Sequence, residues 1–343
     1  TPRQASELPK ITRLLLLITK QRYLWDLCLI YPKEKIKPRK MKTLIVHLAW
    51  VTTLLMSPSI FAQIPTPKQG MVYTSVQQAI VNQGILLNLR NQELEQAPAA
   101  LERLPQLKFL NLMKNGLTSW NSSILTLKNL EVLNIRQNKL TDVPQQIDQL
   151  ESLIRLNLAK NNIEELPATL GKLKDLKLLH LTKNQLMRLP NELGNLTNLK
   201  VLDIDKNKLG TLPATFKKLK NLRSLIAGYN KITYLPQEIC QLAQLDKLNL
   251  EHNLLKSLPE NIGMMKGLRA LILSNNQLQA LPESLTKLDH LELLVLSKNQ
   301  IEKMPHQLGQ LKELRTLILS GNPLTEQEKK RIQKALPKCD IRF

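Results

Sequence analysis

The sequence predicts an α/β solenoid made of stacked 23-residue units with short parallel strands. Leucines recur at fixed positions, and one period read from Leu107 is LxxLxLxxNxLxxLPxxLxxLxx. Asparagine recurs ten times at a spacing of 23 residues, at Asn115, Asn138, Asn161, Asn184, Asn207, Asn230, Asn253, Asn276, Asn299 and Asn322. Because the pattern recurs without a change of register, one structural unit is repeated along the chain.

Each unit contributes one short strand to the predicted sheet. Successive side chains of a strand point to opposite faces, so Leu156 and Leu158 point inward while Arg155 and Asn157 point outward. About seven apolar side chains per repeat face the core, and their burial stabilises less than the ordering of one repeat costs. A single repeat therefore cannot fold alone, and stacking between capped ends is required.

The chain turns away from the strand at each asparagine. The short amide can pair with backbone groups that such a turn leaves unpaired, so we expect the ten asparagines to have a structural role. A Leu-Pro pair follows in most repeats and predicts a bend, because proline fixes φ and lacks an amide hydrogen. The pairs are Leu166-Pro167, Leu189-Pro190, Leu212-Pro213, Leu235-Pro236, Leu258-Pro259 and Leu281-Pro282.

Residues 84–324 resemble the leucine-rich repeat family, in particular its 23-residue class that contains Leu-Pro. The period lies within the range of this family and differs from that of ankyrin and tetratricopeptide repeats. The matching region covers about 70% of the chain and about eleven strands. The resemblance implies a right-handed, curved horseshoe with the strands on its concave face. It also implies a protein that binds other macromolecules, usually proteins, on that face and has no enzymatic activity.

A capping helix is expected before the repeats. Residues 63–83 are interpreted as a linker followed by a helix from Tyr73 to Val81, with Thr74 or Ser75 as its N-cap. The first repeat is degenerate, because Gln92 stands where the asparagine is expected.

Residues 325–343 are interpreted as the second cap. Thr325 and Glu328 match a capping box that opens a helix, and Pro337 ends it. We expect Ile341 and Phe343 to cover the last edge of the core.

Residues 41–62 have the layout of a secretory signal peptide. Lys42 precedes an apolar run of about 14 residues, and small residues lead to Ala62 before Gln63. The run is short for a membrane span, which needs about 20 residues. We expect cleavage after Ala62; a retained membrane anchor or a buried helix is the alternative. Residues 1–40 are interpreted as an upstream extension, or alternatively as a cytoplasmic tail. This predicts a secreted, periplasmic or envelope protein with no stable membrane span in the mature chain.

The chain is basic, with a net charge of +21. Residues 1–62 hold 11 Lys or Arg and 3 Asp or Glu, so without them the net charge is +13. Two basic columns flank the strands. The first contains Lys108, Lys177, Lys200, Arg223, Arg269 and Arg315, and the second contains Lys114, Lys160, Lys183, Lys206 and Lys298.

Stacked at about 4.8 Å per strand, these columns would attract anionic polymers or acidic proteins, or form a merely solvated face. An anionic polysaccharide is thus the alternative ligand. Nucleic acid is disfavoured, since aromatic residues are 3% of the chain and the strands offer no stacking platform.

The outward side chains of the strands vary between repeats and are predicted to bind a protein partner. The predicted contact residues are Arg136, Arg155, His180, Asp203, Asp205, Tyr229, Lys247, Glu251, Ile272, Leu293, Val295 and Ile318. The apolar ones, Ile272, Leu293, Val295 and Ile318, are expected to form a contiguous exposed patch of the kind that marks protein interfaces. The alternative is ordinary β-propensity on a short sheet.

A group of polar residues lies near the middle of this face. His180, Asp203 and Asp205 come from neighbouring strands, and Glu251 lies two strands further on. A metal site built from oxygen and imidazole ligands is one interpretation. Contact with an arginine or lysine of a partner is the favoured one.

The sequence contains no feature of an enzyme or of a bound cofactor. No CxxC, HExxH, GxSxG or phosphate-binding glycine loop occurs, and the register leaves no long insertion for a catalytic pocket. Cys240 and Cys339 lie over four repeats apart, about 20 Å at strand spacing, and are expected to remain unpaired.

Overall fold

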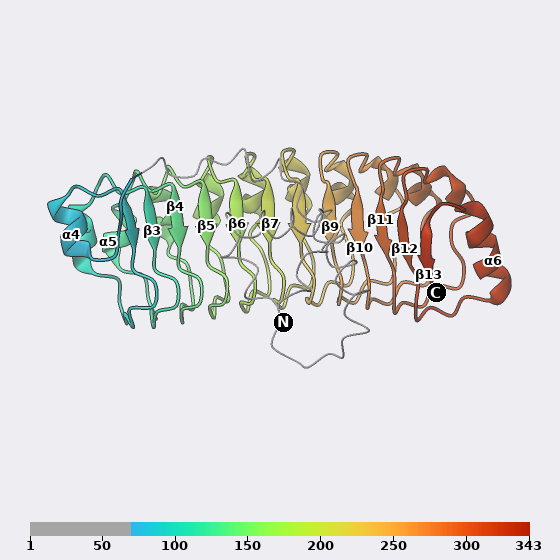
Figure 1. Cartoon of the computed structure of the whole chain (residues 1–343), viewed down its shortest axis with the longest axis horizontal. Helices are drawn as coiled ribbons and strands as arrows, with labels where there is room; N and C mark the ends of the chain where they lie inside the picture. Colours follow the sequence, from blue (N-terminus) through green and yellow to red (C-terminus); the bar gives the residue numbers. More distant parts are fainter. Residues whose placement is uncertain (1–69) are drawn as a thin grey trace, which may run out of the picture. The chain divides into compact units, whose positions relative to one another are not determined.

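The repeats form one parallel sheet. In the computed structural model of the protein, which describes residues 70–343, thirteen strands follow one another in chain order (Figure 1). Neighbouring strands pair in register; Leu202, for example, lies beside Leu225, 23 residues later. The predicted solenoid of short parallel strands is therefore confirmed.

Most strands are three residues long. They are β1 (Val72–Tyr73), β2 (Leu86–Asn88), β3 (Phe109–Asn111), β4 (Val132–Asn134), β5 (Arg155–Asn157), β6 (Leu178–His180), β7 (Val201–Asp203), β8 (Ser224–Ile226), β9 (Lys247–Asn249), β10 (Ala270–Ile272), β11 (Leu293–Val295), β12 (Thr316–Ile318) and β13 (Asp340–Arg342).

Between consecutive strands, most repeats carry a short 3₁₀ helix. These are η2 (Ala99–Arg103), η3 (Gln145–Gln149), η4 (Ala168–Lys172), η5 (Asn191–Asn195), η6 (Ala214–Lys218), η7 (Gln237–Gln241), η8 (Ile262–Met264), η9 (Glu283–Lys287) and η10 (Leu308–Gln310). Helix α5 (Ser122–Leu125) takes this place in one repeat. Proline directly precedes most of them; Pro190, with φ −67°, precedes η5. The Leu-Pro pair thus sets the start of the helical turn, which the sequence had predicted only as a bend.

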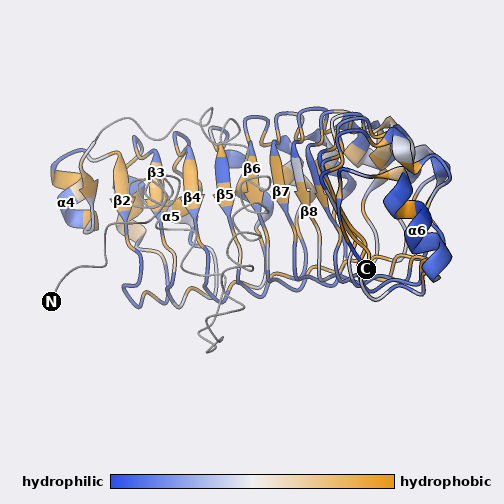
Figure 2. Cartoon of the chain, turned by 45° about the vertical axis from the view of Figure 1, so that its right-hand side comes forward, coloured by the Kyte–Doolittle hydropathy of each residue, from blue (hydrophilic) through white to orange (hydrophobic). Residues whose placement is uncertain are grey.

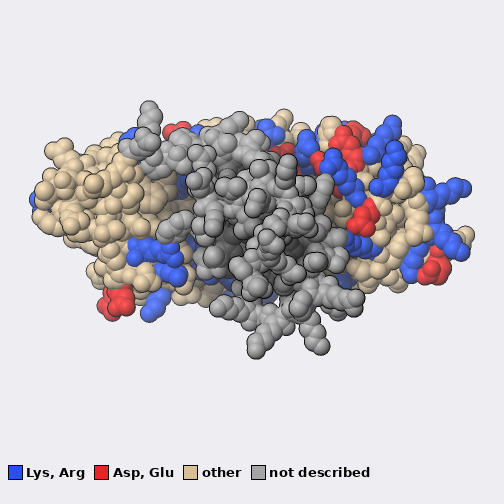
Figure 3. Space-filling model, viewed as in Figure 1, with Lys and Arg blue, Asp and Glu red and all other residues tan. Residues whose placement is uncertain are grey.

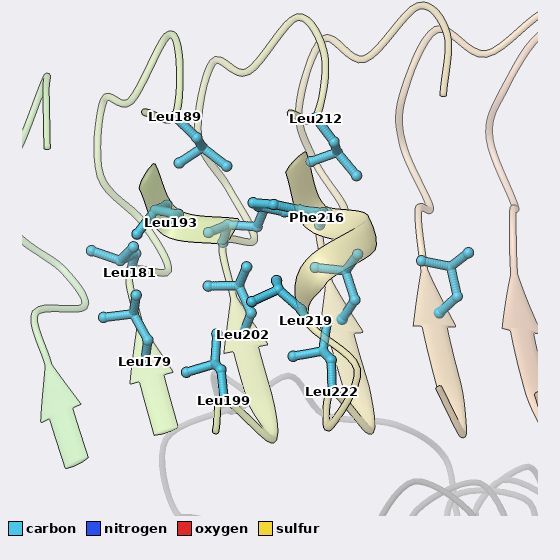
Figure 4. Close-up of a cluster of buried hydrophobic side chains, with 14 of the residues drawn as sticks. Leu179, Leu181, Leu189, Leu193, Leu199, Leu202, Leu212, Phe216, Leu219 and Leu222 are labelled. Carbon is cyan, nitrogen blue, oxygen red and sulfur yellow. The ribbon is translucent and has the colours of Figure 1, made fainter. Parts of the chain in front are cut away.

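The core runs as one continuous apolar layer through the stacked repeats. Leucines of the strands, such as Leu179 and Leu202, meet Leu193 and Phe216 from the 3₁₀ helices (Figure 4). Hydrophobic and hydrophilic residues are interspersed in strands and loops alike, and β5 is largely hydrophilic (Figure 2). Since each core residue touches its counterpart in the next repeat, stability depends on contacts between neighbouring repeats.

Each ladder asparagine joins two repeats through three backbone hydrogen bonds. Asn184 donates from Nδ2 to the carbonyl oxygens of Leu181, at 2.9 Å, and Leu158, at 3.1 Å. Its Oδ1 accepts from the backbone N–H of Ile163 at 3.1 Å. The same three kinds of bond recur from Asn115 to Asn322. The amide therefore satisfies buried backbone groups at the point where the chain leaves the strand.

Helix α4 (Val76–Val81) lies at the N-terminal end of the repeats (Figure 1). Its N-cap is Ser75, whose hydroxyl accepts from the N–H of Gln78 at 3.5 Å. The predicted helix began too early, because Tyr73 belongs to β1 and pairs with Leu87. The tyrosine is held in the sheet by this pairing, and its ring lies close to Gly84.

Helix α6 (Glu326–Ala335) lies at the C-terminal end. Thr325 accepts from the N–H of Glu328 at 3.2 Å, as a capping box requires. The reciprocal bond is absent among the described residues, because Glu328 accepts instead from the N–H of Met304 and from Arg331, both at 2.7 Å. Glu328 therefore ties the helix to the last repeats. This part of the predicted capping box was wrong.

The last residues of the chain cover the C-terminal edge of the core. Ile341 and Phe343 pack against the core at the C-terminal end, where β13 adds a strand that the sequence did not predict.

The predicted extension and signal peptide, residues 1–62, lie outside the described residues. Within residues 70–343, no helix has the length and hydropathy needed to cross a membrane. Cys240 is buried, Cys339 is half-buried, and both are free thiols.

Candidate functional site

The strand face consists of the outward side chains of the strands and of the residues just after them. On β7, for example, Val201 and Asp203 point outward, Leu202 and Ile204 are fully buried, and Asp205 is half-buried beyond the strand. In-register pairing places the equivalent residues of all repeats in rows across the sheet. The predicted contact residues all lie in these rows or, for Tyr229, in the row directly beside them.

An acidic cluster, made of Asp203, Asp205 and Glu251, lies at the middle of this face. Asp203 faces His180 on the neighbouring strand, with 3.7 Å between His180 Nδ1 and Asp203 Oδ2. Burial alone would raise the pKa of Asp203, but the hydrogen bond and charge of His180 hold it below its ordinary value. The sequence prediction that these strands bring the residues together is met by this geometry.

The side chains of Asp205 and Glu251 lie over Gly228 and occupy the space above it. A Cβ atom added to this glycine would lie 2.8 Å from Asp205 Oδ1 and 3.0 Å from Glu251 Cγ. The absence of a side chain at Gly228 thus lets the side chains of two acids, which follow β7 and β9, approach the same spot. Burial and the nearby charge of Asp203 raise the pKa of Asp205 to about 7, and Glu251 contributes in the same direction.

Lys247, the first residue of β9, lies near the acidic cluster. Burial lowers its pKa to about 8, while the charges of Asp203, Glu251 and Asp205 act in the opposite direction. Lys206 and Lys183 also act on Asp205, and the raised pKa of Asp205 shows that these cations do not fully offset burial and the neighbouring carboxylates. Such a shortage of positive charge is electrostatically suited to a basic side chain.

The last residue of several strands also has a structural role that the sequence interpretation missed. Asn134, Asn157 and Asn249 each accept a hydrogen bond from the N–H two residues later, at 2.9 to 3.1 Å, and Asp203 does the same for Asp205. These side chains form Asx turns at the strand ends. The sequence signal was available as Asn or Asp recurring in one column up to Asn249, with interruptions at His180 and Ile226.

The apolar patch is smaller than predicted. Val295 and Ile318 are half-buried, but Ile272 and Leu293 are only 8% and 4% exposed. The prediction of four exposed apolar residues was therefore wrong for Ile272 and Leu293.

Tyr229 lies between two side chains of the adjacent repeats. Its ring is stacked on His252, with centroids 4.2 Å apart, and Lys206 Nζ lies 4.7 Å from the ring centroid. These three residues occupy one repeat position, directly before the ladder asparagines, and all have positive φ. The periodicity predicts that they are neighbours, but not that their side chains stack.

The first predicted basic column is interrupted by acids in the same repeat position. Lysines and arginines pair along it as Lys108–Glu131 (2.8 Å), Arg223–Asp246 (3.9 Å), Arg269–Glu292 (2.7 Å) and Arg315–Glu292 (3.6 Å). Basic and acidic side chains are likewise interleaved toward the C-terminal end in Figure 3. The prediction of an uninterrupted positive column was wrong, because Glu131, Asp246 and Glu292 occupy the same repeat position.

Four lysines of the second column and one arginine form what we call the cationic strip. It consists of Lys114, Arg136, Lys160, Lys183 and Lys206. Burial lowers the pKa of Lys160, and the charges of the other four residues lower it further. In-register pairing of β3 to β7 places these five cations in adjacent repeats.

The metal interpretation of the acidic cluster finds no support. Within residues 70–343, no group of three or more His, Cys, Asp or Glu side chains is arranged to hold a metal ion. His180 contacts Asp203, whereas Asp205 and Glu251 meet over Gly228. The cluster is therefore spread along the sheet.

Sequence comparison identifies the class of protein. Models described as "Leucine-rich repeat region" and "Leucine rich repeat" match residues 217–340 and residues 105–163 and 128–186, and a "Leucine Rich Repeat" model matches 198–219. The chain therefore contains leucine-rich repeat domains. Among curated protein sequences, none matches this chain.

Solved structures resemble the chain over most of its length. A TDR receptor is 29% identical, with a TM-score of 0.60 over 77% of this chain and 52% of the receptor chain. The plant peptide hormone receptor RGFR1 in complex with RGF2 is 28% identical, with a TM-score of 0.56 over 69% of this chain and 44% of that one. The chain spans about half the length of these receptors. The internalin inlF from Listeria monocytogenes, 24% identical with a TM-score of 0.58 over 80% and 84%, shares the fold.

Proposed function

We propose that this protein is a non-enzymatic recognition module that binds a protein partner on the concave strand face. The observation that carries the proposal is the convergence of the Asp205 and Glu251 side chains over Gly228. The raised pKa of Asp205 is consistent with a shortage of positive charge there. A lysine or arginine of the partner would supply that charge, and the carboxylates would orient it.

The comparisons support this class of function. Leucine-rich repeat domains fill the region that the strand face spans, and one similar structure is a peptide hormone receptor in complex with RGF2. Val295 and Ile318, which stay partly exposed, extend the proposed contact surface toward the C-terminal repeats. Arg136 and Arg155 extend it toward the N-terminal ones.

The proposal includes export. Residues 41–62 are the proposed signal peptide, and the working compartment is then the cell envelope or the exterior. Peptide mass mapping of the protein purified from its host should give a first residue near Gln63. Recovery of peptides from residues 1–40 in the purified protein would contradict this part of the proposal.

Capture of the partner tests the recognition surface. The protein is immobilised, exposed to envelope and extracellular fractions of its host, and the retained proteins are identified by mass spectrometry. Glu251→Lys reverses one charge beside Gly228 and should reduce retention of the specific partner by about tenfold or more, because a like charge opposes the partner's cation.

Glu302→Lys is the matched control. Glu302 is exposed and lies away from the strand face, on the turn after a ladder asparagine. It changes the net charge equally and should leave retention unchanged. Equal retention by the Glu251 variant and the unaltered protein would refute the central contact.

The alternative ligand class, an anionic polysaccharide, concerns another surface. The first basic column is largely paired with acids, so only the cationic strip could serve such a ligand. One observation favours it: five consecutive repeats place a cation at the same edge of the strand face.

A further inference from the structure

Five consecutive repeats, those of β3 to β7, each place one cation at the same edge of the strand face. In four of them the cation is a lysine directly before the ladder asparagine. In the repeat of β4 this position is Gln137, and the preceding residue, Arg136, supplies the charge instead. The cationic strip is therefore unbroken from Lys114 to Lys206.

The strip is an uncompensated positive surface. None of its five residues forms an ion pair among residues 70–343, whereas the other basic column is paired with Glu131, Asp246 and Glu292. The groups that act on Lys160 are all cations: Arg136, then Lys183, Lys114 and Lys206. Acids lie near its two ends: Glu93 and Glu95 line a hollow together with Lys114, and Asp205 interacts with Lys206 and Lys183.

The backbone does not explain why lysine occupies these positions. Lys114, Lys160, Lys183 and Lys206 have φ values of 54° to 58°, in the left-handed region that favours glycine and asparagine. The C-terminal repeats use those residues in the same row, Asn275 and Gly321. The same row also holds Gln137, Tyr229, His252 and Lys298, so the backbone accepts several residue types there and does not require lysine.

The geometry selects among anionic ligands. Strands lie about 4.8 Å apart, so the strip presents one charge per repeat over roughly 19 Å. In an extended acidic peptide, side chains on the same side are about 6.7 Å apart. This distance does not match the roughly 4.8 Å between neighbouring cations of the strip. A linear polysaccharide with one carboxylate or sulfate on each sugar can place an anion at each repeat.

Nucleic acid fits less well. Single-stranded nucleic acid binds through aromatic platforms beside cations, and Tyr229 is the aromatic residue next to the strip. Its ring lies between Lys206 on β7's repeat and the stacked His252 on β9's repeat. A base therefore has no open ring face at this position.

We propose that the cationic strip is a binding site for a linear anionic polysaccharide that runs across β3 to β7, one anionic sugar per repeat. The site does not rest on the proposed protein recognition, because it uses none of the acidic cluster. It meets that cluster at Lys206 and Asp205, so the polysaccharide and a protein partner would lie side by side.

Binding to polygalacturonate, with uncharged dextran as reference, tests the site. The variant is Lys160→Gln combined with Lys183→Gln. Glutamine already occupies this row as Gln137, with φ 61°, so the backbone is expected to tolerate it. The double variant should bind polygalacturonate about tenfold more weakly, and the slope of log affinity against log salt should fall by about 2, as for other polyelectrolyte contacts.

The control removes two charges from the paired column, by Lys108→Gln with Arg269→Gln. It lowers the net charge equally and should bind polygalacturonate within about twofold of the unaltered protein. Circular dichroism verifies that both double variants are folded.

Several outcomes overturn the proposal. One is an equal loss of affinity in both double variants, which would indicate attraction by net charge alone. Others are unchanged binding by the strip variant, or no binding of polygalacturonate at all. Tighter, strip-dependent binding of poly-glutamate or single-stranded DNA would assign the strip to an acidic protein or to nucleic acid.

Discussion

At the scale of single residues, the ladder asparagines combine small size with three backbone hydrogen bonds. We expect Asn184→Ala to lower the free energy of unfolding by about 3 kcal/mol, because it leaves two carbonyls and one N–H unpaired in a buried place. The denaturation midpoint in urea, followed by circular dichroism, measures this. Asn162→Ala is the control, since Asn162 is exposed, and should change stability by less than about 0.5 kcal/mol. Equal effects of both changes would contradict the account.

Asp205 makes stability depend on pH. Its pKa in the folded protein is about 7, against about 3.9 in an unfolded chain. The folded state therefore binds its proton more tightly, and stability is lost as the pH rises from about 4 through 7. Asp205→Asn, which resembles the protonated acid, should match the unaltered protein at about pH 3.5, below the pKa of the unfolded chain. At pH 8.5 it should be more stable by about 1 kcal/mol, a value reduced for partial solvent exposure. Thermal melts at both pH values measure this, and an equal difference at both would exclude Asp205 as the cause.

Residue positions could be predicted from the sequence, but their contacts could not. A period of 23 assigns each side chain to a row, and so it brought His180 and Asp203 together correctly. Glu131 and Glu292 fall in the same row as the first basic column and were readable in the same way. Whether Tyr229 stacks on His252, or Asn157 turns back to its own backbone, depends on rotamers that the period does not determine.

At the scale of single elements, the 3₁₀ helices set the distance between repeats. Gly194 on η5 is buried, and a Cβ there would collide with the carbonyl oxygen of Thr215 in the next repeat. We expect Gly194→Ala to cost about 1–3 kcal/mol, because overpacking pushes the two repeats apart. Denaturant unfolding measures the change.

Gly210 gives the matched control for this prediction. A Cβ there would meet nothing within 4 Å, so Gly210→Ala should be neutral or stabilise by about 0.5 kcal/mol through the unfolded chain. Destabilisation by both substitutions would indicate a general requirement for glycine and not close packing between repeats.

The elements were predicted where the pattern repeats and missed where it stops. Alternation in LxL located β2 to β12, since a period of two residues reports a strand directly. Strands β1 and β13 do not contain the LxL pattern. They form by pairing with β2 and β12 of the adjacent repeats. The 3₁₀ helices were missed because three to five residues carry too short a pattern to distinguish a helical turn from a bend.

At the scale of the whole molecule, each repeat contacts only its neighbours, so a full period can be removed without changing any other contact type. Deletion of residues 162–184 joins Asn161 to Gln185 and preserves the asparagine register. We expect a folded protein by circular dichroism, with a thermal midpoint lower by about 5 °C. Because Lys183 is lost from the cationic strip, binding of polygalacturonate should weaken by a few fold and not disappear.

Deletion of residues 162–183, one residue fewer, retains Asn184 and shifts the register of the neighbouring repeats. A one-residue shift turns every inward side chain of a strand to the opposite face. This variant should lose cooperative melting unless the extra residue is expelled into the loop. A shorter deletion that melts as cooperatively as the full-period one would mean that the repeats tolerate changes of register. In that case the asparagine ladder would hold the loops in place without setting the fold.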